Sequence, residues 1–83
     1  MDRYLIISPH TAQDCKKIIQ LVEAMGYITH FDWGCKDGDH TAWAIIEADS
    51  KPEALLSVPS SHRHIARAVK IVKFTPKEAE HQG

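Results

Sequence analysis

The chain has 83 residues, which is enough for one domain with a small core, and its ten Lys and Arg residues balance eleven Asp and Glu residues. This balance, without any charge block, argues against a nucleic-acid-binding protein. No apolar run approaches the ~20 residues of a membrane helix, and the N-terminus lacks a signal-peptide plan, so we expect a cytoplasmic protein with no membrane partner. Two cysteines in a reducing compartment are expected to be free thiols or metal ligands, and six histidines are many for this length.

The first two predicted elements are a strand and an amphipathic helix. Residues 3–8 form a β-branched and aromatic run that ends before Pro9, which predicts a strand covered on both faces. Thr11, with Asp14 three residues later, is typical of a helix start. Gly26 is typical of a helix C-terminus. Between them, apolar side chains recur at helical spacing and predict a helix packed on a core: Cys15, Ile18, Ile19, Val22 and Met25.

Residues 27–35 and 40–48 predict a second and a third strand, joined by a hairpin. Asp37-Gly38 is a two-residue turn signal that places Cys35 directly opposite His40. Opposed residues lie on the same face, with Cβ atoms roughly 4.5–5.5 Å apart. The face of this hairpin that carries Cys35 also carries small alanines, which allow a helix to approach, so we expect it to face the helices: Ala42, Ala44 and Ala48.

The C-terminal half of the chain completes a βαββαβ order. Ser50-Lys-Pro-Glu53 has the spacing of a capping box and predicts a short helix through Leu56, before Pro59. Residues 68–74 predict the fourth strand. This order predicts an α+β, ferredoxin-like fold: a four-stranded antiparallel sheet, order 4-1-3-2, with both helices on one face. Residues 1–75 form the single domain, and residues 76–83, including His81, a polar tail.

This topology brings chemistry-bearing residues to one edge of the sheet. The end of the first strand, the start of the first helix and the hairpin all lie there, so His10, Cys35 and His40 are predicted to form a metal site. Thiolate and imidazole ligands select zinc, nickel, copper or iron over magnesium and calcium. Cys15 is assigned to the same edge, but its place in the apolar stripe predicts a buried, inert thiol. The end of the second helix should bring histidines nearby as well: His62 and His64.

The other sheet face offers a rival site. His30, Asp32 and Glu47 would lie there beside apolar Trp43 and Ile45. They could supply a general base or a ligand set within a cavity, since a carboxyl beside apolar surface has a raised pKa. Alternatively, they are polar contacts at the rim of a dimer interface. A small core and a mixed, uncovered face favour a homodimer through this surface.

In its element order the chain resembles the dimeric α+β-barrel group of ferredoxin-like proteins, which includes muconolactone isomerases, small monooxygenases of the antibiotic-biosynthesis type and small nickel-binding proteins. The last of these is the closest in pattern. The resemblance rests on a cysteine in the first helix, an aromatic strand leading into an Asp-Gly hairpin, a return strand ending Glu47-Ala48, a short helix broken by Pro59, and a last strand ending Phe74-Thr-Pro. It implies a homodimer with a cavity between the sheet and the partner, and nickel or zinc as the metal.

Three functions follow from these patterns. The first is a small metal-binding or metal-sensing homodimer that uses the edge at Cys35 and His40. The second is a small-molecule binder or a cofactor-independent enzyme, of the isomerase or monooxygenase type, with its cavity on the open sheet face. The third is an interaction module without a ligand. We favour the first because convergence of thiol and imidazole groups is the less common coincidence, and whether the protein is an enzyme stays open.

Overall fold

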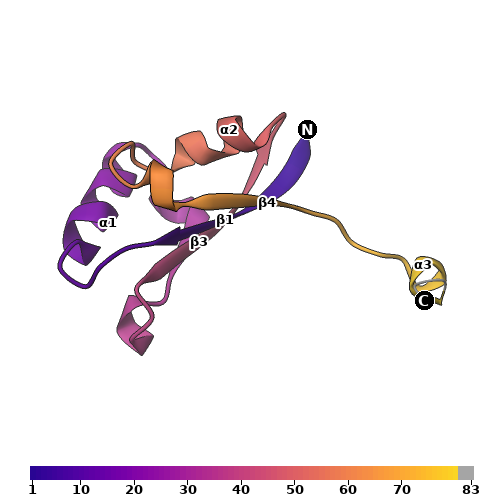
Figure 1. The fold of residues 1–83 in the computed structure, drawn as a ribbon, viewed down its shortest axis with the longest axis horizontal. Coiled ribbons are helices and arrows are strands. Elements are labelled where there is room, and N and C mark those ends of the chain that lie inside the picture. The colour runs from indigo at the N-terminus through magenta and orange to yellow at the C-terminus, as the bar shows by residue number, and fades with distance from the viewer. Residues whose placement is uncertain (81–83) are drawn as a thin grey trace.

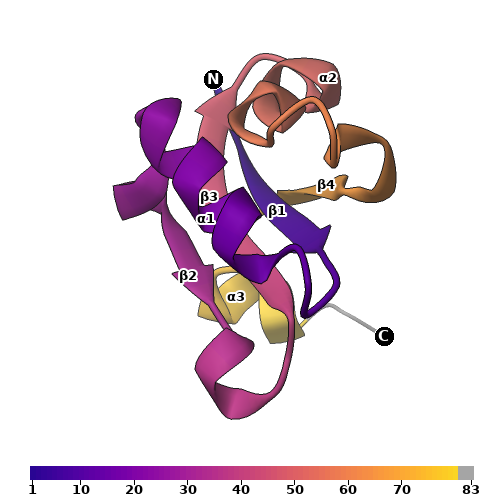
Figure 2. The ribbon, with the colours of Figure 1, turned by 90° about the vertical axis from the view of Figure 1, so that its left-hand side faces the viewer.

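The computed structural model, which describes residues 1–80, is an α+β structure in which a four-stranded antiparallel sheet is covered on one face by two helices (Figures 1 and 2). The predicted class, the antiparallel sheet and the placing of both helices on one face are confirmed. The elements are β1 (Asp2–Pro9), α1 (Cys15–Ala24), β2 (Phe31–Trp33), β3 (Thr41–Ala48), α2 (Lys51–Ala54), β4 (Arg67–Ile71) and α3 (Pro76–Glu80).

The neighbours along the sheet are β2-β3-β1-β4, which counted from the opposite edge reads 4-1-3-2. β1 lies in the centre, antiparallel to β3 on one side and to β4 on the other. The prediction that both faces of β1 are covered is wrong, because burial alternates along the strand: Ile6 and its neighbours on the helix-facing side are buried, whereas Leu5 and Ile7 on the other face are only partly buried. Because β1 and β3 are antiparallel, the C-terminal end of β1 lies beside the start of β3, at the same end of the strands as the connection between β2 and β3.

The core lies between the sheet and the two helices. Ile6 of β1 and Ile18 of α1 are almost fully buried there. Small side chains on β3 let α1 and α2 lie close to the strand, as expected: Ala42, Ala44 and Ala48 are all buried. On the opposite face of β3, Ile45 is 50% exposed, because neither α1 nor α2 reaches that side.

The first helix begins later than the sequence predicted. Residues 11–14 form a turn in which the Asp14 amide donates to the Thr11 hydroxyl, at 3.2 Å, and α1 starts at Cys15. Thr11 thus closes a turn ahead of the helix instead of capping it. The expected C-terminal glycine is confirmed: Gly26 has a φ of 84° and donates its amide to the Glu23 carbonyl.

The predicted second strand is much shorter in the structure. Residues 28–30 form a 3₁₀ turn, and only Phe31–Trp33 pair with β3. The pairing register is the expected one, since Phe31 faces Ala44 and Trp33 faces Ala42. Beyond Trp33 only one further strand-like hydrogen bond forms, from the Gly34 amide to the Thr41 carbonyl.

The predicted two-residue turn at Asp37-Gly38 is wrong. Cys35–Asp37 form a 3₁₀ turn instead, followed by Gly38 in the left-handed conformation with a φ of 85°. The Gly34 carbonyl accepts hydrogen bonds from the amides of both Asp37 and Asp39, at 2.9 and 3.0 Å. These two local bonds hold the chain in a compact loop and take the place of the ladder bonds that a tight hairpin would have made.

The end of the chain departs from the body of the domain. β4 stops at Ile71, so the predicted strand over 68–74 is too long, and an extended segment leads to α3, which lies apart from the sheet (Figure 1). Thr75 and Glu78 cap α3 reciprocally, hydroxyl to amide and carboxylate to amide. Part of the predicted tail is therefore helical, while residues 81–83, with His81, lie outside the described residues.

The second helix agrees better with its prediction at the start than at the end. The Ser50 hydroxyl accepts from the Glu53 amide at 3.2 Å, which is the expected cap. The α-helical part ends at Ala54 and continues as a 3₁₀ turn over Leu55–Ser57. In the described part of the chain, no helix has the length and apolar character needed to cross a membrane.

Candidate metal site

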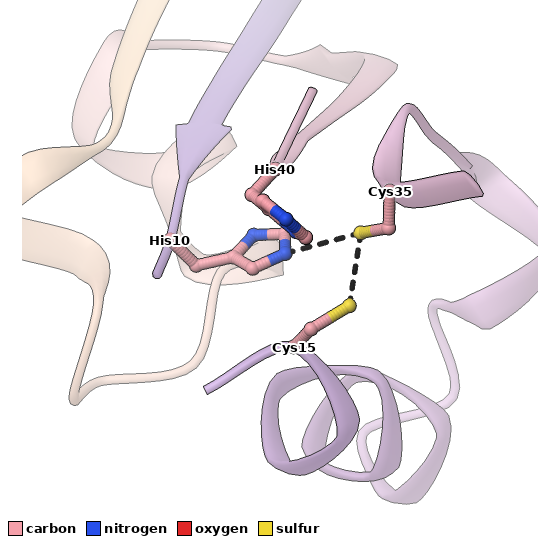
Figure 3. A group of neighbouring side chains, drawn as sticks. All are labelled: His10, Cys15, Cys35 and His40. Atoms are coloured by element: carbon pink, nitrogen blue, oxygen red, sulfur yellow. Dashed lines mark hydrogen bonds between the residues drawn. The ribbon is translucent and has the colours of Figure 1, made fainter. Parts of the chain in front are cut away.

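Four potential metal ligands meet at one edge of the sheet (Figure 3). His10 follows β1, Cys15 is the first residue of α1, Cys35 opens the 3₁₀ turn, and His40 precedes β3. One ligand atom from each residue lies within 4.8 Å of the ligand atoms of the other three. The cluster is therefore assembled from four separate segments of the chain, which is why no compact sequence motif marks it.

Backbone pairing holds the two histidines together. The His10 amide donates to the His40 carbonyl at 2.9 Å, one step beyond the last pair of the β1–β3 ladder, Pro9 and Thr41. The two imidazole rings meet edge to face, with centroids 5.9 Å apart and an interplanar angle of 69°. Because this contact extends a regular ladder, the rings are placed by the sheet and do not depend on the loop alone.

The loop places Cys35 by close packing at Gly34. A Cβ atom at Gly34 would lie 2.6 Å from the Asp39 carbonyl oxygen and 3.0 Å from the Trp43 ring, so only glycine fits without displacing the loop. The Thr41 hydroxyl donates to the Asp39 carboxylate at 2.7 Å and fastens the other side of the loop. These contacts lie on either side of Cys35 and His40, so they hold the backbone positions from which the two ligand side chains project.

The sulfur and nitrogen atoms are already nearly at the spacing of a tetrahedral metal site. The Cys15 and Cys35 Sγ atoms are 2.9 Å apart, and Cys35 Sγ is 3.2 Å from His10 Nε2. Zinc bonds of ~2.0–2.3 Å at tetrahedral angles separate ligand atoms by roughly 3.3–3.8 Å. A metal ion would therefore need these three atoms to move slightly apart, and any ligand atom near the 4.8 Å limit of the cluster to move closer.

Both imidazoles also carry a buried polar atom that nothing satisfies. Nδ1 of His10 and Nδ1 of His40 have no hydrogen-bond partner among residues 1–80. Buried polar atoms are nearly always paired, so each exception calls for an explanation. An imidazole binds an ion through one nitrogen, so His10 would use Nε2, which already lies beside Cys35 Sγ, while the unpaired Nδ1 of His40 is free to act as a ligand.

Burial shifts the protonation equilibria of two residues in the cluster, His10 and Cys35. Loss of solvation lowers the pKa of His10, and the nearby His40 and His62 lower it further. The Ser8 backbone has the opposite effect on this pKa, smaller than that of the lost solvation. Loss of solvation also raises the pKa of Cys35 to about 11, and the hydrogen bond with Cys15 adds to the increase. Burial therefore favours the neutral imidazole at His10 and the neutral thiol at Cys35.

A further histidine lies beside the cluster. His62 is 8% exposed, and its Nε2 lies 3.3 Å from the Asp14 carboxylate, next to the start of α1. Its Nδ1 is 2.9 Å from the Ser61 hydroxyl. His62 therefore connects the loop before β4 to the turn that precedes Cys15. His64, which we also expected in this neighbourhood, is exposed.

The structure brings the three predicted ligands together and adds a fourth. His10, Cys35 and His40 meet as expected, although the turn that was meant to pair the last two does not form. Cys15, which we expected to be an inert core thiol, is only partly buried and contacts Cys35. Its position in the sequence could have indicated this contact, because the first residue of a helix that begins beside His10 can reach the other ligands as well as the core.

The rival set of residues on the other face is divided between two places. His30 and Glu47 line one cavity of about 450 Å³, together with Arg3, Tyr27, Ile45 and Ile46. Asp32 lines a second cavity of about 340 Å³, near Trp33 and Cys35. The predicted group of three ionisable side chains in one cavity is therefore not assembled.

The fold and the cluster define an α+β protein with two thiols and two imidazoles close enough to hold a metal ion. No protein-family model, curated protein or solved structure matches the chain. The function has to be argued from the site itself.

Proposed function

We propose that the protein binds one transition-metal ion through His10, Cys15, Cys35 and His40. The observation that carries the proposal is the convergence of four ligand atoms, from four segments of the chain, within 4.8 Å of one another. The unpaired Nδ1 of His40 supports it. Each ligand has its own backbone support, so binding needs no refolding of the domain.

Zinc fits this donor set better than nickel. Two sulfurs and two nitrogens from the protein complete a tetrahedral site, the geometry typical of structural zinc, whereas Ni²⁺ favours square-planar or tetragonal arrangements. A site with four protein ligands also leaves no open position for substrate, which points to metal storage, sensing or stabilisation of the fold. Ionised thiols require a reducing environment, which supports a cytoplasmic location.

The test is metal analysis of untagged protein purified under reducing conditions. We expect one equivalent of metal in the wild type, and loss of it in Cys35→Ser and His40→Ala. His64→Ala is the matched control, because His64 is an exposed histidine outside the cluster. Loading with Co²⁺ should give thiolate charge-transfer and tetrahedral d–d absorption bands. Equal metal content in Cys35→Ser, His40→Ala and the control would reject the proposal.

We also propose that the protein is a homodimer of the ferredoxin-like, dimeric α+β-barrel type, joined through the open sheet face. Two features support it. Apolar side chains cover this face, on strands that α1 and α2 cover only from the other side; Ile45 is 50% exposed and the others are partly buried: Leu5, Ile7, Trp43, Val69 and Ile71. The segment after β4 leaves its own domain with Val72 and Phe74 at least 60% exposed, which suits contact with a second copy.

The second candidate function is binding of a small molecule in the cavity lined by Arg3, His30 and Glu47. Its volume of about 450 Å³ lies in the range of ligand sites, and a cation, an imidazole and a carboxylate converge there. A metabolite screen by thermal shift tests it, with Glu47→Gln as the variant that should lose a stabilising hit. A hit equally strong in that variant would place the ligand elsewhere.

A further inference from the structure

We infer that Cys15 and Cys35 are also a redox-active dithiol, which a low-molecular-weight disulfide such as oxidised glutathione converts into an intramolecular disulfide. The same two sulfurs would then be lost to the metal, so oxidation releases the ion. This regulatory step rests on the proposed metal binding, whereas the reactivity of the thiol pair does not.

The geometry of the two thiols is the first support. Their sulfur atoms are 2.9 Å apart, in direct contact, although the residues are separated by 20 positions in the sequence. Figure 3 shows the two side chains pointing toward each other, from the start of α1 and from the loop before β3. Both residues are free thiols and only partly buried, so a small disulfide can reach them. The sequence contains no other cysteine.

The reaction balances with one disulfide consumed. The Cys15 thiolate attacks one sulfur of oxidised glutathione, forms a mixed disulfide, and releases one glutathione thiolate, which takes a proton. The Cys35 sulfur then loses its proton to Nε2 of His10, 3.2 Å away, attacks the Cys15 sulfur and releases the second glutathione. The second glutathione leaves as a thiolate and takes the proton held by His10. In total the protein loses two protons and two electrons, and one oxidised glutathione becomes two reduced molecules.

Metal binding and this disulfide exclude each other. A metal ion binds both sulfurs as thiolates. In the disulfide the two sulfurs are bonded to each other and neither is a thiolate. Oxidation would leave only His10 and His40, and two imidazoles hold zinc far more weakly than a complete set of four ligands. The position of both cysteines in one four-ligand cluster thus makes metal occupancy dependent on the thiol–disulfide balance.

The experiment treats the full chain, metal-free and metal-loaded, with oxidised glutathione in the absence of oxygen. Intact mass spectrometry should show the metal-free wild type losing two hydrogen atoms without retaining glutathione, reversibly with dithiothreitol. In the loaded protein, a chromophoric chelator should report complete metal release in step with this change. Cys35→Ser should stop at the mixed disulfide on Cys15.

His40→Ala separates the two proposals. It should bind metal weakly yet form the disulfide like the wild type, because it removes a ligand and leaves both thiols in place. If the wild type forms the disulfide but never binds metal, the metal proposal fails and the dithiol remains. If the metal-free wild type stays reduced, or carries glutathione on both cysteines without closing the bond, the dithiol inference is overturned, whatever the metal content.

Discussion

The backbone amide of His10 donates a hydrogen bond to the carbonyl of His40 at 2.9 Å, so the β1–β3 ladder runs one step past its last regular pair and ends with an imidazole on each strand. Two histidines 30 positions apart in sequence are thereby fixed side by side, with ring centroids at 5.9 Å. Cys15 and Cys35 close the group from the helix and from the loop.

Replacing Cys15 by Ser should weaken metal affinity at least about 100-fold, since a hydroxyl is a poor substitute for a thiolate ligand. Even residues that only hydrogen-bond to a ligand change metal affinity by about 10–100-fold when they are mutated. Competition with a chromophoric chelator measures the change. His64→Ala, an exposed control, should bind like the wild type. Wild-type affinity in Cys15→Ser would show that this thiol is structural, as its place in the apolar stripe first indicated.

The Cys35 thiol should alkylate slowly in metal-free protein at neutral pH, with a rate that rises up to its pKa of about 11, because only the thiolate reacts. Mass spectrometry after iodoacetamide treatment reports each cysteine separately. Removing the Cys15 thiol in Cys15→Ser should move the Cys35 profile to lower pH, since the hydrogen bond with Cys15 contributes to the shift. A Cys35 rate already at its plateau at pH 8 would contradict the prediction.

The same shift predicts how the stability of metal-free protein varies with pH. A thiol whose pKa is higher in the folded than in the unfolded chain stabilises the fold in its protonated form, so its contribution is present below 9.0 and is lost as the pH rises from 9.0 to about 11. Urea unfolding across this range should show the decline. In Cys35→Ser the part of the decline that Cys35 causes should be missing.

Gly34→Ala should lower stability by about 1–3 kcal/mol, because the new methyl group overlaps the Asp39 carbonyl and the Trp43 ring. The φ of Gly34 is −91°, which any residue adopts, so the overlap alone is tested. Gly38→Asn is the control: it sits in open space at a positive φ that Asn tolerates, at a cost of under about 1 kcal/mol. Metal affinity should fall in the first variant only, as the loop moves Cys35. Equal stability losses in the two variants would contradict this account.

Ile45→Glu should convert the proposed dimer to a monomer, since burying an unpaired carboxylate in an interface costs several kcal/mol. Leu56→Glu is a matched control, because Leu56 is 54% exposed against 50% for Ile45 and follows α2 on the other side of the sheet. Light scattering at micromolar concentration measures the mass of each variant. A monomeric wild type, or a dimer that survives Ile45→Glu, would reject the open face as the interface.

Sequence patterns were enough to predict the elements whose causes are local. The apolar run of β1, the helical spacing that ends at Gly26 and the cap at Ser50 are properties of neighbouring residues, and the structure has all three. The register between β2 and β3 is also as predicted, although the Asp37-Gly38 turn from which it was derived does not form. A slip by one residue would turn the small alanines of β3 away from the helices.

The form of the loop and the composition of the site depend on tertiary contacts that the sequence patterns did not reveal. Asp37-Gly38 favours a tight turn locally, but the packing of Gly34 against Trp43 and its two hydrogen bonds favour a wider loop. Cys15 has the spacing of a core residue, and its contact with Cys35 depends on where α1 begins relative to the end of β1. The contact between Cys15 and Cys35 joins residues 20 positions apart, and the packing of Gly34 against Trp43 depends on how the loop folds back on β3, so neither follows from a local sequence pattern.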